Sequence, residues 1–100
     1  MIRHIVMWNI EDGVNGRTKE ENGLLFKEKI EALKSTIAEI VEIEVALDIL
    51  HTDQSRDMVL VGDFKSLEDL KTYAGHKDHL EVVVLGKEFL RDRVVCDYDF

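Results

Sequence analysis

Tyr73, His76 and His79 lie within seven consecutive positions, in the stretch TYAGHKDH, and all three can donate, accept or relay protons. Side chains of these types are typical of sites for acid–base chemistry. Helix ends also collect polar residues, which cap the free backbone groups or contact water. The stretch therefore fits either an active site or a helix junction, and the surrounding elements decide between them.

A fourth candidate, His4, shares one side of a strand-like segment with Val6 and Trp8. If that side meets the helices, the imidazole lies among apolar groups and needs a hydrogen-bond partner. A tyrosine or histidine of the helix junction could be this partner. Because the ordinary pKa of histidine is about 6.5, the same arrangement could hold a general base near neutral pH. A purely structural hydrogen bond is the alternative.

His76 and His79 are three residues apart, a spacing that would suit a metal ion if both lay on one helix. No cysteine or Glu-x-x-His completes a ligand set, and Gly75 is expected to interrupt the helix between Tyr73 and His79. The sequence therefore predicts no metal site. It favours a kinked junction from which Tyr73 and His79 converge over a pocket lined also by His76, Val6, Trp8 and Leu60.

The composition indicates one small domain over residues 1–100, with 45% hydrophobic and 34% charged residues. A formal net charge of −8 repels phosphate groups, so nucleic-acid and membrane partners are disfavoured. Cys96 is the only cysteine, which excludes an internal disulfide and fits a cytoplasmic location. Its strand-like neighbours predict a small core residue.

Periodicity predicts the elements that position these side chains. A helix is expected from the T-x-x-E capping box at Thr18 to about Thr36, a second helix from Ser66 to Gly75, and a third from about Asp78 with Leu80, Val83 and Val84 facing inward. Strands are predicted over residues 2–10, 40–50, 58–64 and 93–100, with residues 41, 43, 45, 47 and 49 sharing one face of the second strand.

This order is β-α-β-β-α-β, with the second helical region broken in two. It predicts an α+β, ferredoxin-like fold in which helices cover one face of a four-stranded antiparallel sheet. The first and third strands carry apolar residues on both sides. The uncovered face is therefore expected to be buried in a homodimer that joins two sheet faces into a barrel.

Four stretches together resemble the stress-responsive dimeric α/β barrel (Dabb) domain family: MIRHIVMW, EALKSTIAEI, FKSLEDLKTYAGHKDHL and RDRVVCDYDF. The most specific features are a tyrosine followed three residues later by His-Pro-x-His, and a final strand ending in Val-x-Asp-Tyr. Tyr73, His76, His79 and residues 95–98 match them, whereas Lys77 replaces the usual proline. The substitution removes a fixed helix start but leaves both histidines in place.

The resemblance implies a fold and a dimer more firmly than a reaction. Some members of the family are stress-induced plant proteins, and one plant member cyclises a polyketide by aldol condensation without a cofactor. By the resemblance, the matching catalytic positions here are His79 as base, Tyr73 as its assistant and His4 nearby. A related barrel family contains cofactor-free monooxygenases. Two function classes remain open: a protein that binds a small apolar or carbonyl ligand, and an enzyme that uses the His/Tyr pair.

Overall fold

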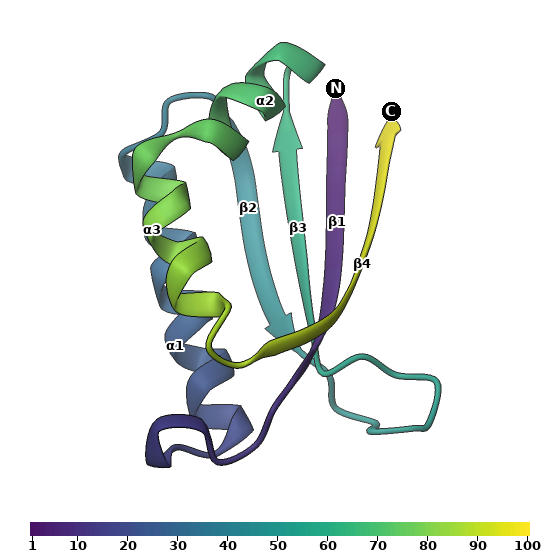
Figure 1. Cartoon of the computed structure of the whole chain (residues 1–100). Coiled ribbons are helices and arrows are strands. Elements are labelled where there is room, and N and C mark those ends of the chain that lie inside the picture. Colours follow the sequence, from purple (N-terminus) through teal and green to yellow (C-terminus); the bar gives the residue numbers. More distant parts are fainter.

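A computed structural model describes all 100 residues and shows a single sheet with three helices on one of its faces (Figure 1). The elements are β1 (Ile2–Ile10), α1 (Lys19–Ala32), β2 (Ile40–Leu47), β3 (Met58–Phe64), α2 (Leu67–Gly75), α3 (Lys77–Gly86) and β4 (Leu90–Asp99). The strands are all antiparallel, in the order β2-β3-β1-β4. The predicted ferredoxin-like α+β fold is confirmed, and no helix is both long and apolar enough to cross a membrane.

Helix starts follow from local side-chain chemistry. The Thr18 hydroxyl accepts the Glu21 N–H at 3.1 Å while the Glu21 carboxylate accepts the Thr18 N–H at 2.9 Å, which is the predicted capping box. The Ser66 hydroxyl accepts the Asp69 N–H in the same way at the start of α2. Gly75 ends α2 as expected, and the next residue, His76, caps α3. The chain therefore changes direction between Tyr73 and His79.

The inner side of β1 builds the core beneath the helices. Val6, Trp8 and Ile10 are buried there, and the predicted apolar face of α1 packs against them. Buried members of this core on α1 and just beyond it are Phe26, Ile30, Leu33 and Ile37. The α-helix ends at Ala32 and a short 3₁₀ turn, Leu33–Ser35, carries the chain to the predicted end.

The predicted face of α3 was partly wrong. Leu80 and Val84 are exposed, whereas Val82 is buried. The helix packs on α1, and a Cβ at Gly86 would lie 2.9 Å from a ring carbon of Phe26. This close contact with α1 rotates the buried stripe of α3 away from the positions that periodicity alone selects.

The second strand also differs from its prediction. It ends at Leu47, and Ile49 lies in the following loop with 85% of its surface exposed. A register shift between Ile40 and Glu42 buries Ile40 as well as Ile43 and leaves Val41 only half-buried. The strict alternation over residues 41–49 therefore does not hold.

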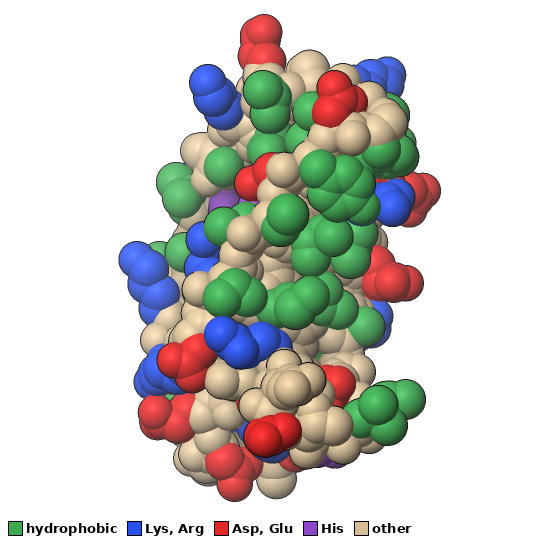
Figure 2. Space-filling model, turned by 90° about the vertical axis from the view of Figure 1, so that its right-hand side faces the viewer, with side chains coloured by type: hydrophobic (Ala, Val, Ile, Leu, Met, Phe, Trp, Pro, Cys, Tyr) green, Lys and Arg blue, Asp and Glu red, His purple; other side chains and the backbone are tan.

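The outer face of the sheet carries an apolar strip that the helices do not cover (Figure 2). Pairing between strands places Ile5 beside Val61 and Cys96, and Met7 beside Val59 and Val94. The prediction that Cys96 lies in the core was wrong for this chain, because its position on β4 points to the outer face and leaves it exposed.

The outer edge of β2 is bonded to α1. The Glu31 carboxylate accepts the Val45 N–H at 3.0 Å, and the Lys27 ammonium donates to the Val45 carbonyl at 2.5 Å. Lys27 and Glu31 also form an ion pair at 2.6 Å, one helical turn apart. Two side chains of α1 thus form hydrogen bonds with the N–H and carbonyl of Val45, which do not pair with β3.

Candidate functional site

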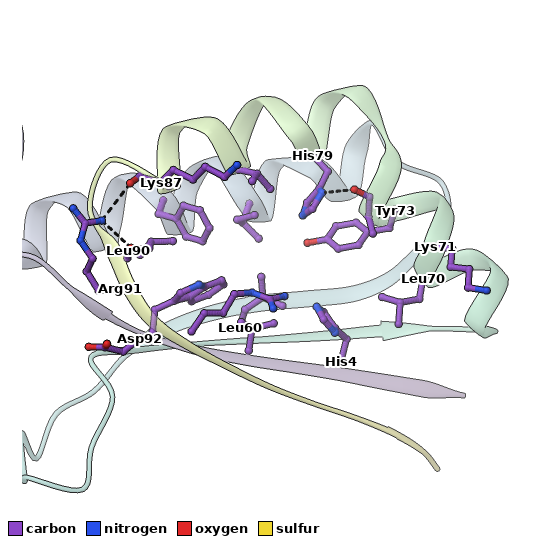
Figure 3. Close-up of a pocket in the computed structure, with 18 residues that line it drawn as sticks. His4, Leu60, Leu70, Lys71, Tyr73, His79, Lys87, Leu90, Arg91 and Asp92 are labelled. Atoms are coloured by element: carbon purple, nitrogen blue, oxygen red, sulfur yellow. Dashed lines mark hydrogen bonds between the residues drawn. The ribbon is translucent and has the colours of Figure 1, made fainter.

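A cavity of about 540 Å³ lies between the inner face of the sheet and helices α2 and α3 (Figure 3). Its walls are mostly apolar and include the side chains of Val6, Trp8, Phe26, Ile30, Leu60, Val83 and Leu90. The volume and the lining suit a small organic molecule. Tyr73, His79 and His4 also line this cavity, so the structure brings the three candidate residues together around one space.

His79 reaches the cavity from the first turn of α3. Its Nδ1 lies 2.9 Å from the carbonyl oxygen of Ala74. Because a carbonyl can only accept, Nδ1 carries the proton and Nε2 is the unprotonated nitrogen of the neutral ring. Burial lowers the pKa of His79 below its ordinary value of 6.5. At neutral pH the side chain is therefore uncharged and presents a proton acceptor, and the close-up shows its ring turned toward the sheet (Figure 3).

Tyr73 comes from the last turn of α2 and is 1% exposed. Its ring packs against Phe64 and His79, with centroid distances of 5.0 and 4.3 Å. The hydroxyl makes no hydrogen bond within the protein, yet it is not sealed in the core, so it is open to the cavity. Burial raises the pKa of Tyr73. The hydroxyl therefore stays protonated and can donate to a ligand.

His4 points from β1 toward the helices (Figure 3). Its partner is not a side chain of the helix junction, as the sequence suggested, but Asp97 of β4, whose Oδ1 lies 2.5 Å from His4 Nδ1. The two residues are opposite each other in the antiparallel pairing of β1 and β4. Since the carboxylate accepts, His4 Nδ1 donates, and the carboxylate fixes the ring on the wall facing His79.

The structure does not place His76 in the cavity wall. Its Nδ1 accepts the N–H of Asp78 at 3.0 Å, which caps the first turn of α3. The expected pocket residues Val6, Trp8 and Leu60 do line the cavity. No group of three His, Cys, Asp or Glu side chains is arranged to hold a metal ion.

Sequence reasoning missed two polar residues of β4, Asp97 and Arg93. Alternation along the final strand places residues 93, 95 and 97 on one side of the sheet. Val95 pairs with Val6 and Asp97 with His4, so this side is the inner one. The alternation was readable in the sequence, but the pairing register was not.

The comparisons with known proteins agree with this architecture. A model of the stress responsive A/B barrel domain matches residues 2–100. The chain belongs to this family. A Streptomyces coelicolor protein is 33% identical over the full length of both chains.

Solved structures related to this family member extend the comparison. A dimeric Bacteroides fragilis protein of unknown function and ferredoxin-like fold is 33% identical, with 99% of this chain and 95% of that chain covered and a TM-score of 0.82. A hydroxynitrile lyase from Passiflora edulis shares the fold at 16% identity, with 97% and 90% covered and a TM-score of 0.79. At that identity the likeness concerns the fold alone.

Replacing Tyr73 with phenylalanine is expected to change the free energy of unfolding by less than about 1 kcal/mol, since the lost hydroxyl has no partner in the protein. Tyr73→Ala is the matched comparison and should cost about 3–5 kcal/mol, because it empties a buried aromatic site. Urea denaturation of the two variants measures both values. A loss above about 2 kcal/mol for Tyr73→Phe would mean that the hydroxyl supports the fold and is not reserved for a ligand.

Proposed function

We propose that this family member is a homodimer that binds a small, largely apolar carbonyl compound in the cavity and moves a proton next to its carbonyl group. The observation that carries the proposal is the pairing of two complementary groups in one apolar space. Tyr73 offers a protonated hydroxyl without a protein partner, and His79, whose ring centroid is 4.3 Å away, offers a neutral imidazole.

The proposed step uses each group in the state that its surroundings favour. Nε2 of His79 takes a proton from the carbon next to the carbonyl, and the C–H electron pair becomes the C=C bond of an enol or enolate. The carbonyl π electrons move to oxygen, where the Tyr73 hydroxyl donates a hydrogen bond to the growing negative charge. Return of the proton from His79 to carbon completes an exchange, and attack of the enolate on a second carbonyl gives an aldol product.

His4 and Asp97 have a positioning role in this proposal. Their hydrogen bond of 2.5 Å holds the His4 ring on the sheet side of the cavity, opposite the His/Tyr pair. A ligand between the two walls is thereby confined near His79, which favours a productive orientation. The Passiflora hydroxynitrile lyase supports the view that this fold can carry catalysis, and its own reaction is not transferred to this chain.

The dimer is the second part of the proposal. The apolar strip on the outer sheet face matches a self-complementary interface, and the solved Bacteroides relative at 33% identity is dimeric. Joining two such faces would leave each cavity between its own sheet and helices. A cytoplasmic location is part of the same proposal, because the free thiol of Cys96 suits a reducing compartment.

Hydrogen–deuterium exchange tests the chemistry without a known substrate. A panel of small neutral ketones and oxo acids in D₂O is followed by NMR, and we expect the protein to accelerate label uptake next to the carbonyl of at least one compound. Tyr73→Phe should slow this uptake about 10²- to 10³-fold, as for removal of an oxyanion donor. His51→Asn, in an exposed loop, is the control and should match the wild type. Ligand binding without any exchange would indicate a binding protein and contradict the proposed proton transfer.

A further inference from the structure

The cavity wall carries a charge opposite to that of the whole chain. The chain has 13 Lys and Arg against 21 Asp and Glu, for a net charge of −8. The lining holds four of the basic residues, Lys71, Lys87, Arg91 and Arg93, and a single acidic one, Asp92. A site for neutral apolar molecules does not require this local excess of positive charge.

Arg93 is the only one of the five arginines whose guanidinium makes no hydrogen bond or ion pair in the protein. Arg3 binds Asp63 through two bonds of 2.8 and 3.0 Å, and Arg17 binds Asn22 at 2.7 Å. Arg56 and Arg91 donate to backbone carbonyls. Arg93 is exposed at the cavity wall, so its guanidinium is solvated and free to exchange water for a ligand.

The nearby carboxylates are already engaged with other groups. Asp92 accepts the Asn9 amide at 2.9 Å and lies at the far end of the cavity from His4 (Figure 3), while Asp97 binds His4. Neither forms an ion pair with Arg93. The positive charge of Arg93 therefore remains available to a ligand.

Arg93 also acts on the two groups of the proposed chemistry. Burial is the largest influence on the pKa of Tyr73 and of His79, and the charge of Arg93 acts on each of them as well. Because Arg93, Tyr73 and His79 line the same cavity, one small ligand can contact the guanidinium and both side chains. The planar fork of arginine matches the two oxygens of a carboxylate.

We infer that the cavity selects a small carboxylic acid, an oxo acid whose carboxylate binds Arg93 while its carbonyl lies at Tyr73 and His79. The apolar part of the molecule packs on Trp8, Phe26 and Leu60. The inference rests on the proposed function and adds the substrate class. Lys71 and Lys87, which form no ion pair, strengthen the positive potential that attracts the acid.

Fluorescence of Trp8 tests the inference directly, because it is the only tryptophan and lines the cavity. The wild-type protein is titrated with cyclohexanecarboxylate and with cyclohexanecarboxamide, two probes of nearly equal shape that differ in charge. We expect the carboxylate to bind about tenfold or more tightly, as for a charge-assisted bidentate contact. Arg93→Gln should remove this preference and leave carboxamide binding unchanged. Arg93→Lys should restore only part of it.

Lys29→Gln, an exposed change on α1 outside the cavity, removes the same charge and should keep the preference. The inference is overturned if the wild type binds the carboxamide as tightly as the carboxylate, if it binds neither, or if Arg93→Gln weakens both equally. Arg93 makes no hydrogen bond or ion pair in the protein, so Arg93→Gln is expected to fold. The comparison of the two probes on the wild-type protein tests the inference without any variant.

The exchange assay separates this inference from the proposed function. Tyr73-dependent exchange of neutral ketones with no preference for oxo acids would overturn the carboxylate assignment and keep the proton transfer. Carboxylate binding through Arg93 without any exchange would keep the carboxylate assignment and overturn the proton transfer.

Discussion

Replacement of His79 with alanine is expected to lower the rate of deuterium uptake by about 10²- to 10⁴-fold, the usual contribution of a positioned general base. The other groups of the cavity remain in place, so binding of a carboxylate probe to Arg93 should persist. His51→Asn again provides a control for the loss of one histidine, since His51 lies in an exposed loop. Unchanged exchange in a folded His79→Ala variant would remove His79 from the mechanism.

The pH profile of exchange gives a second readout of His79. Because burial lowers its pKa below 6.5, the neutral base persists to a lower pH than an ordinary histidine. The midpoint of the fall in rate on acidification should therefore lie below pH 6.5.

The free energy of unfolding also depends on the protonation of His79, and it decreases on acidification. As the pH falls through 6.5, the unfolded chain binds a proton at His79 before the folded one does, so the free energy of unfolding decreases. The decrease ends below the folded pKa. Urea denaturation across this range should show it in the wild type and a smaller decrease in His79→Ala, which isolates this group from the other histidines.

Replacement of Val61 with glutamate is expected to convert the proposed dimer into a monomer. Val61 is paired with Ile5 in the middle of the outer sheet face, so two copies would bury two unpaired carboxylates at one interface. Such a change costs several kcal/mol of association free energy. Light scattering after size exclusion should give the mass of one 11.5 kDa chain at micromolar concentration.

Ile49→Glu is the matched control for the dimer test. It makes the same kind of change at an apolar residue that is 85% exposed but lies beyond β2, outside the sheet face. This variant should remain dimeric, and its melting temperature should still rise with protein concentration. A wild-type monomer at micromolar concentration, or a dimeric Val61→Glu, would rule out association through this face.

The parts of the fold that local chemistry determines were predicted from the sequence. The capping box at Thr18, the cap at Ser66 and the break at Gly75 need only neighbouring residues, and β1 shows its inner side by alternation. The inward face of α3 could not be read this way, because close packing between Gly86 and Phe26 sets its rotation.

The candidate site shows the same division. Tyr73 and His79 could be placed over one space because both flank a single helix break. The pairing of His4 with Asp97 depends on the register between two strands that lie at opposite ends of the chain. Arg93 has no hydrogen-bond or ion-pair partner because the fold brings no acceptor to it. No sequence pattern contains that information.

The bonds from α1 to β2 have a consequence for the behaviour of the chain in concentrated solution. An unpaired strand edge is a template on which another molecule can add a strand, and repeated addition gives aggregates or fibres. Here Lys27 and Glu31 already hold both the carbonyl and the N–H of Val45. An incoming strand would have to displace two charged side chains near the C-terminal end of β2, so polymerisation along this edge is opposed from within each molecule.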